Sequence, residues 1–154
     1  MGPALRAWRL AAVVAATAVV LDQAAKQIAV ASLARGEHRN VFLGIDLTNT
    51  RNKGVAFGAL GGGGTLVTAL TVAAVALLAV YFAWGAARPG LWLPFGMVVG
   101  GAVSNLADRA REGAVIDFID PIFWPAFNLA DVSIVVGILG LLYVIEGPPR
   151  KKPQ

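Results

Sequence analysis

The sequence contains no cysteine and a single histidine among its 154 residues. The absence of cysteine excludes disulfides, thiol catalysis, thiolate metal sites and a lipid-modified cysteine in this chain. A Ser/His hydrolase would have to use His38, which lies in a polar stretch and is better explained as a solvated side chain. A zinc site also lacks ligands. We therefore expect no cofactor and no resident metal.

Charged residues are also scarce, at 14% of the chain against 57% hydrophobic residues. A soluble domain of this length cannot hide so much apolar surface, because its surface-to-volume ratio is high. The apolar residues lie in long runs, each close to the roughly 20 residues that cross a bilayer as a helix. The expected spans are about 10–30, 66–84, 91–107 and 129–146. The sequence thus predicts an all-α membrane protein, with residues 1–154 forming one domain around a four-helix transmembrane bundle.

The first apolar run permits a second interpretation as a cleavable signal peptide, because Arg6 and Arg9 precede a short apolar core. That interpretation leaves Asp22 and Lys26 unexplained, since a discarded segment has no need of them. We therefore expect a retained helix.

The orientation follows from the basic residues, which are equal in number on the two predicted sides but denser near the termini. Because Lys and Arg concentrate on the cytoplasmic side, both termini are predicted to be cytoplasmic. The basic tail "PPRKKPQ" suits an anionic inner leaflet, so membrane lipids are expected partners. Nucleic acid is not, since the basic residues are scattered and no stacking platform accompanies them. We expect a monomer.

The largest segment between predicted spans runs from about 35 to 60. It has β-prone stretches at 41–42 and 45–48, separated by Gly44 and followed by the turn-forming "NTRNKG". These features predict a small strand-rich cap on the outer face, between the first and second helices. In the third helix, "GMVVG" is a pattern of small residues that lets helices approach closely.

Ionisable residues inside membrane spans are costly, so each is a candidate functional residue. Asp22 and Lys26 lie four positions apart with the acid first, the favourable order for a helical ion pair. A structural ion pair that fastens the bundle is the favoured interpretation. Gly101, Asn105 and Arg109 also step by four along the third helix. Arg109 fits a side chain that reaches the interface, whereas Asn105 fits that explanation poorly, so a role in holding a loop or substrate stays open.

The stretch "VIDFIDPIFWPAFNLADVS" places Asp117 and Asp131 beside an apolar run. Local explanations exist, because Asn128 suits a helix N-cap, Asp131 suits the first helical turn, and Asp117 could be a loop acid. The link between the two acids is rich in proline and aromatic residues, however, and can fold back as a hairpin at the membrane interface. The two carboxylates would then lie together.

Two carboxylates in a partly dry place share one proton, because both cannot ionise comfortably. The helix N-terminus favours the anionic form of Asp131, which leaves Asp117 as the expected proton holder. One acid and one base around a water can hydrolyse an amide. Mg²⁺ on the aspartates is an alternative. A second alternative is a small ion- or proton-coupled transporter with an ion path formed by Asp22, Lys26, Asp117 and Asp131. A third alternative is a structural membrane subunit.

The chain resembles the prolipoprotein signal peptidases, or signal peptidase II, over nearly its whole length. Five motifs in the same order carry the resemblance. They are "LDQAAK" (Asp22, Lys26), "NKGVAFG" (Asn52, Gly54, Ala56, Phe57), "GGAVSNLADR" (Gly101, Asn105, Arg109), "VIDFI" (Asp117) and "FNLADVSI" (Asn128, Ala130, Asp131).

This resemblance implies an aspartyl endopeptidase of the bacterial inner membrane, with Asp117 and Asp131 as the catalytic pair. Its substrates would be diacylglyceryl-modified prolipoproteins, cleaved just before the lipidated cysteine. The pair would lie toward the outer face, beside a β-cradle, and would bind the cyclic peptide inhibitor globomycin. The supporting positions implied by the family are Asn52, Gly54, Gly101, Asn105, Arg109, Asn128 and Ala130.

Overall fold

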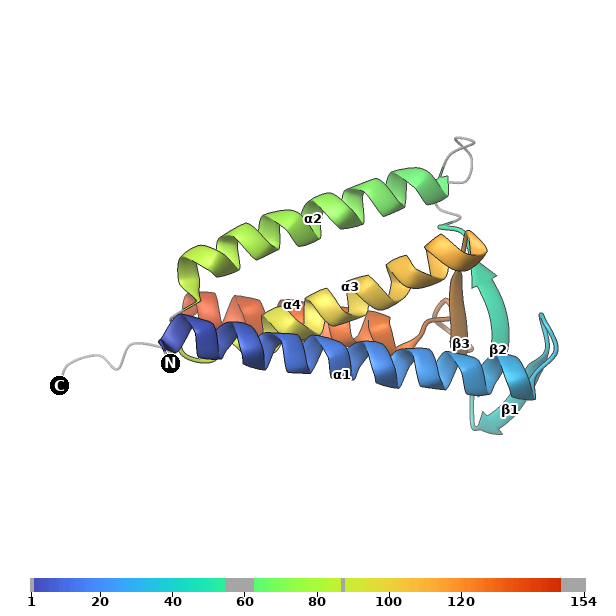
Figure 1. Ribbon diagram of the computed structural model, residues 1–154. Coiled ribbons are helices and arrows are strands. Elements are labelled where there is room, and N and C mark those ends of the chain that lie inside the picture. Colours follow the sequence, from blue (N-terminus) through green and yellow to red (C-terminus); the bar gives the residue numbers. More distant parts are fainter. Residues whose placement is uncertain (1, 55–62, 87, 148–154) are drawn as a thin grey trace.

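The computed structural model describes residues 2–54, 63–86 and 88–147 of the chain (Figure 1). Helices and strands follow one another in the order α1, β1, β2, α2, α3, β3, α4. Their bounds are α1 Pro3–Ser32, β1 His38–Phe42, β2 Ile45–Asn52, α2 Gly63–Gly85, α3 Trp92–Glu112, β3 Val115–Pro121 and α4 Leu129–Glu146.

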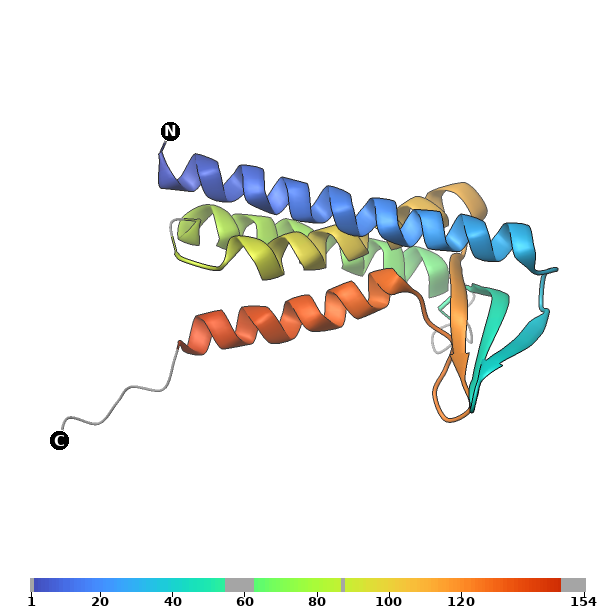
Figure 2. The ribbon, with the colours of Figure 1, turned by 90° about the horizontal axis from the view of Figure 1, so that it is seen from below.

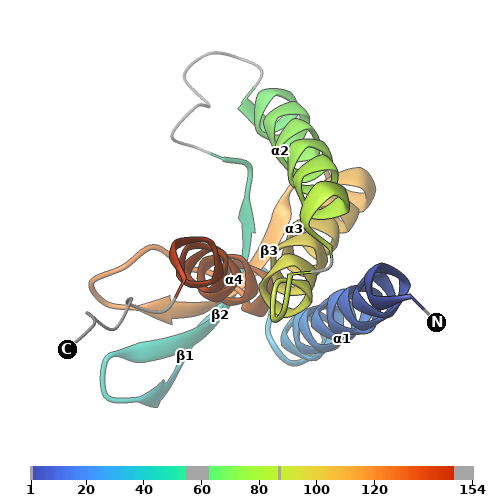
Figure 3. The same ribbon diagram turned by 90° about the vertical axis from the view of Figure 1, so that its left-hand side faces the viewer.

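Helix α3 lies at the centre of the bundle, with α1, α2 and α4 around it (Figure 3). Two adjacent glycines allow this arrangement. A Cβ added at Gly100 would lie 2.6 Å from the carbonyl oxygen of Ala15 in α1. One added at Gly101 would collide with the backbone of Ala130 and lie 2.8 Å from Cγ1 of Ile134 in α4. The close approach expected from "GMVVG" is confirmed for α1, because Gly96 and Gly100 both face that helix.

Three of the described helices are long and apolar enough to cross a membrane: α1, α2 from Gly64 onward, and α4. Helix α1 packs against α3 and contributes to the interior of the bundle, which the signal-peptide interpretation does not predict. Helix α3, expected as the third span, is not among the three. Its second half carries Ser104, Asn105 and Asp108, all buried, because the central helix turns a polar face toward its neighbours rather than toward lipid.

The sheet is antiparallel with the strand order β1-β2-β3, and it closes one end of the bundle (Figure 1). The prediction of a cap built only from residues 35–60 is therefore incomplete, because β3 comes from the segment after α3. The turn predicted at "NTRNKG" is also placed too early. Residues 49–52 continue β2, since β3 offers them hydrogen-bond partners. Residues 55–60 of the predicted cap, including Ala56 and Phe57, lie outside the described residues.

The segment between β3 and α4 folds back on the sheet, as the aromatic hairpin prediction required (Figure 2). Phe127 pairs with Ile119, its N–H donating to the Ile119 carbonyl at 2.9 Å and its carbonyl accepting from Ile119 at the same distance. This pairing brings the start of α4 beside β3. The predicted acids Asp117 and Asp131 therefore reach the same end of the bundle.

The α3–α4 contact yields a test of packing. Gly101→Ala should lower the free energy of unfolding by about 1–3 kcal/mol, because the added methyl group overlaps the backbone of α4. Thermal unfolding of the purified protein in detergent measures the change. Gly64→Ala is the matched control, since a Cβ there would have its nearest neighbour at 3.8 Å, and this variant should be as stable as the parent or slightly more so. Equal stability of Gly101→Ala and Gly64→Ala would contradict the close α3–α4 contact.

Candidate active site

Asp117 lies on β3 opposite Thr50 of β2, and its side chain is buried, with 2% exposed. Both carboxylate oxygens accept hydrogen bonds from asparagine amides. Nδ2 of Asn128 donates to Oδ1 at 2.8 Å, and Nδ2 of Asn52 donates to Oδ2 at 3.0 Å. The carboxyl group is thus held in a fixed orientation by two neutral donors.

The position of Asn52 depends on Gly54. The Gly54 N–H donates to Oδ1 of Asn52 at 2.8 Å, which directs the other end of that amide toward Asp117. Gly54 has φ +75°, a conformation that glycine adopts without steric cost. Gly54, one of the supporting positions implied by the resemblance, therefore helps to orient the Asn52 side chain.

Asp131 stands in the first turn of α4 and is half-buried. The local prediction for this turn is confirmed, because Asn128 is the N-cap and forms a capping box with Asp131. The Asp131 N–H donates to Oδ1 of Asn128 at 2.9 Å, and the Asn128 N–H donates to Oδ2 of Asp131 at 3.2 Å. From α3, Nδ2 of Asn105 donates to Oδ1 of Asp131 at 2.8 Å.

Asn128 joins the two acids. It is fully buried, and its backbone N–H and side-chain carbonyl hold Asp131 while its amide N–H₂ group bonds Asp117. The same N–H₂ group also donates to Oδ1 of Asn105 and to the Ile116 carbonyl, each at 3.2 Å. The structure therefore brings together the two acids that the sequence separates by 14 positions.

Burial raises the pKa of Asp117 to about 6. The hydrogen bond from Asn52 works against this rise, the nearby charge of Asp131 adds to it, and Asn128 and the more distant Lys26 lower the pKa again. Near neutral pH, Asp117 can therefore both hold and release a proton. This is the behaviour expected of one member of a coupled acid pair.

The predicted ion pair is present, with Nζ of Lys26 lying 2.6 Å from Oδ2 of Asp22. It is part of a larger cluster, because Nζ also lies 2.7 Å from Oδ2 of Asp108 and donates to Oδ1 of Asn105 at 2.9 Å. Neither Asp22 nor Lys26 exposes any side-chain surface. A buried ammonium needs such partners, because desolvation without them is costly.

Asp108, Gln23 and Ser104 are residues that the sequence analysis missed. The expected third span ends at residue 107, but α3 continues to Glu112 and buries Asp108. Nε2 of Gln23 donates to Oδ1 of Asp108 at 2.8 Å and to Oγ of Ser104 at 3.0 Å. Ser104 and Asp108 lie four positions apart, so the same spacing rule that selected Gly101 and Asn105 could have found them.

The other predicted positions differ in their relation to the site. Ala130 is fully buried at the α3–α4 contact, where its carbonyl oxygen faces Gly101. Arg109 is half-buried near the end of α3, where its carbonyl accepts from the Gly113 N–H, and its side chain makes no hydrogen bond or ion pair with the described residues. Of the stripe Gly101–Asn105–Arg109, Asn105 bonds an acid and Gly101 allows the close α3–α4 contact.

An apolar groove of about 290 Å³ lies beside Asp131, between α4 and the link that precedes it. Apart from Asp131 itself, its lining residues are Trp124, Phe127, Val132, Val135 and Val136. A carboxyl group thus stands at the edge of a surface suited to hydrocarbon.

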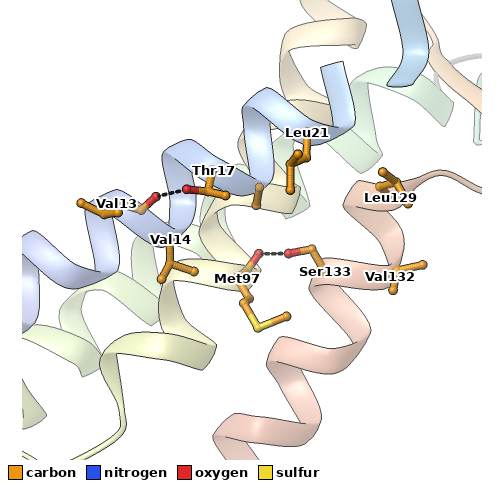
Figure 4. Close-up of a pocket in the computed structure, with 9 residues that line it drawn as sticks. Val13, Val14, Thr17, Leu21, Met97, Leu129, Val132 and Ser133 are labelled. Atoms are coloured by element: carbon orange, nitrogen blue, oxygen red, sulfur yellow. Dashed lines mark hydrogen bonds between the residues drawn. The ribbon is translucent and has the colours of Figure 1, made fainter. Parts of the chain in front are cut away.

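A second groove, of about 380 Å³, lies between α1 and α4 with Met97 at its floor (Figure 4). Leu129 and Ser133 line it, and each is two positions from Asp131, which places them on the opposite side of α4. The hydroxyl groups of Thr17 and Ser133 donate to the carbonyls of Val13 and Met97, each at 2.9 Å, and so present little polarity to the groove. Neither acid lines this groove, although Val132 lines both grooves.

Within the described part of the chain, no three or more histidine, aspartate or glutamate side chains converge as a metal-binding group. All four carboxylate oxygens of Asp117 and Asp131 instead accept amide hydrogen bonds. Such an arrangement can position a water between an acid and a base, which is the chemistry of peptide hydrolysis without a covalent intermediate.

Coupled acids at one end of an apolar helix bundle define a class of protein, the aspartic-type membrane peptidases. Comparison with protein families agrees: the model described as signal peptidase (SPase) II matches residues 14–146. The chain belongs to this signal peptidase II family and is a multi-pass membrane peptidase.

Several curated relatives are similar over most of their length. The lipoprotein signal peptidase of Halothermothrix orenii is 36% identical over 128 residues, covering 82% of this chain and 88% of the relative. That of Syntrophomonas wolfei is 39% identical over 137 residues, covering 87% and 92%.

Solved structures of bacterial membrane enzymes determined by the in meso method share the fold. One at 1.9 Å resolution has a TM-score of 0.74 at 30% identity, covering 86% of this chain and 89% of the other. One at 2.3 Å has a TM-score of 0.79 at 28% identity, covering 94% and 92%.

Proposed function

We propose that Asp117 and Asp131 are the catalytic pair with which the chain removes signal peptides from diacylglyceryl-modified prolipoproteins, cutting just before the lipidated cysteine. The observation that carries this proposal is that Asn128 bonds both carboxylates, Asp117 through its side-chain amide and Asp131 through its backbone N–H. It couples a carboxyl group on a strand to one on a helix N-terminus.

The two acids take different roles in this mechanism. Asp131, in the first turn of α4, accepts a proton from water as that water attacks the scissile carbonyl carbon. Asp117 holds its proton and donates it to the substrate, so that the leaving amine departs neutral. The amides of Asn52, Asn105 and Asn128 keep both carboxyl groups oriented throughout.

The groove beside Asp131 supports a lipid-bearing substrate. Its aromatic and valine walls continue onto the outward face of α4, where Val135 and Leu139 are exposed. A diacylglyceryl group entering sideways from the bilayer keeps its acyl chains in apolar surroundings, whereas extraction would cost about 0.8 kcal/mol per methylene. We expect a globomycin-type cyclic peptide to compete for the same place, and a single copy of the chain to suffice.

The proposed topology has four crossings, with α3 as the third, the sheet at the outer surface and both termini in the cytoplasm. Support comes from the exposed apolar tips of the sheet end, where Leu43 is 90% exposed and Phe123 is 96% exposed, with Trp124 beside them. Such side chains favour the membrane interface. The N-terminus and the α2–α3 turn, which carries Arg88, lie at the opposite end (Figure 1).

The clustering of acids argues against the transporter alternative. An ion path needs carboxylates spread through the depth of the bilayer. Asp22, Asp108 and Asp131 instead belong to one connected network beside the sheet. A clustered pair at one face is what a peptidase requires.

Asp117→Asn and Asp131→Asn should each abolish cleavage of a purified lipid-modified precursor while leaving the protein folded. Asparagine keeps the shape of the side chain but cannot exchange the proton. Asp120→Asn is the matched control, because Asp120 pairs with His38 at 3.0 Å outside the network, and it should cleave like the parent. Turnover by either of the first two variants would reject the pair.

The pKa of Asp117 generates a pH dependence. Because the required form of Asp117 is protonated, kcat should decline as pH rises through about 6. Asn52→Ala removes a hydrogen bond that lowers this pKa, so the decline should move to higher pH, with the charges of Asp131 and Lys26 unchanged. The control is Asn40→Ala. This variant loses a hydrogen bond between β1 and Asp46 of β2, away from Asp117, and should keep the pH profile of the parent. A decline that moves to lower pH in Asn52→Ala would contradict this assignment.

The topology is tested with a reporter fused after Gln154. A reporter that works only in the cytoplasm should be active at this position, since the basic residues near the termini favour the cytoplasmic side. Activity of the complementary reporter that works only outside the cytoplasm would overturn the orientation.

A further inference from the structure

A single buried ammonium group connects the two helices that flank the acid pair. Nζ of Lys26 bridges Oδ2 of Asp22 on α1, at 2.6 Å, and Oδ2 of Asp108 on α3, at 2.7 Å. The three side chains are at most 2% exposed, so water does not compete for these contacts. Charge-assisted bonds in such surroundings are short and directional.

Each of the two carboxylates also accepts a backbone hydrogen bond. Oδ1 of Asp22 accepts from the N–H of Ala130 at 2.9 Å. Oδ2 of Asp108 accepts from the N–H of Ile116 at 3.2 Å. Ala130 immediately precedes Asp131, and Ile116 immediately precedes Asp117. Each carboxylate therefore connects Lys26 to the residue that immediately precedes one of the two acids.

We propose that Lys26, acting through Asp22 and Asp108, sets the separation and orientation of the two catalytic acids. All three are positioning residues, since none contacts the reacting atoms. The inference rests on the proposed roles of Asp117 and Asp131, and it assigns to the ion cluster a part in catalysis beyond fastening the bundle.

The two acids need such a restraint because they stand on separate elements. Asp117 belongs to a strand, and Asp131 belongs to a helix that begins after an exposed link. The water that they activate must fit between them, and a displacement on the order of 1 Å from productive geometry can cost about 10²-fold in rate. Asn128 touches both acids but lies on the α4 side, whereas the Lys26 cluster is anchored in α1 and α3.

A purely structural role and a positioning role predict different kinetics. If the cluster only fastens the bundle, weakening it reduces the amount of folded enzyme and leaves kcat per folded molecule unchanged. If it positions the acids, kcat falls while KM for the lipid-modified precursor stays the same, because the substrate groove beside Asp131 is untouched.

The experiment uses Asp22→Asn and Asp108→Asn in the full chain, with Asp120→Asn as the matched control. The two oxygens of Asp22 hold Lys26 and the Ala130 N–H separately, so asparagine there must lose one of the two contacts. One oxygen of Asp108 accepts from both Lys26 and the Ile116 N–H, so asparagine there removes the charge that holds Lys26 and places an N–H₂ donor against the Gln23 amide. Each variant should lose about ten- to a hundredfold in kcat per folded molecule, with KM within about twofold of the parent. An unchanged kcat in both variants would overturn the proposal.

The double variant Asp22→Asn/Asp108→Asn tests whether both acids act through one lysine. Because the first substitution already releases the shared restraint, the combined loss in kcat should be smaller than the product of the two single losses. A combined loss equal to that product would mean independent roles and would reject the shared restraint.

Hydrogen exchange provides a measurement that does not depend on activity. In the unaltered protein, the amides of Ile116 and Ala130 should both be protected from exchange, because each donates to a buried carboxylate of the cluster. In Asp22→Asn, the Ile116 amide should also exchange faster, although its own acceptor is intact. Fast exchange of both amides in the parent would refute the restraint even if every variant fails to fold. Failure of the proposed catalytic roles would be recognised separately, because the Asp117→Asn variant would then still cleave the precursor.

Discussion

A polar group buried in an apolar bundle must find a hydrogen-bond partner inside the protein, and this constraint shapes the whole sheet end of the molecule. Among the described residues, no buried side-chain nitrogen or oxygen lacks a partner. Lys26 stands at the centre, since it links α1 to α3 and, through Asn105, to Asp131 on α4. Elements far apart in the sequence meet there because each supplies hydrogen-bond partners for the buried polar groups of the others.

Close backbone contact makes this network possible. Gly100 and Gly101 let α3 approach α1 and α4 at neighbouring faces, so short side chains such as Ser104 and Asn105 can span the gap. The start of α4 is then bonded on two sides, by its own cap Asn128 and by Asp22 from α1. A helix N-terminus held in this way has little freedom, and the acid in its first turn shares that rigidity.

Local spacing was enough to predict much of this site. It could not predict which distant segments pair with one another. The ion pair of Asp22 and Lys26 and the cap at Asn128 follow from intervals of four and three positions, which any helix repeats. The third strand was missed because a strand's partner is set by the fold and not by its own residues. Asp108 was missed because the expected third span ends at residue 107, although its spacing of four from Ser104 places both side chains on one face of the helix.

The choice of donors around the acids is itself informative. Asn52, Asn105 and Asn128 are neutral, so they orient the carboxyl groups without forcing both to ionise, as an adjacent cation would. The one buried cation, among the residues whose positions the structure describes, is kept one amide away from Asp131, because Asn105 accepts from Lys26 and donates to the acid. Burial can then hold the pKa of Asp117 at about 6 despite the network around it. Asparagine contacts and a lysine held at a distance thus leave Asp117 able to exchange its proton near neutral pH.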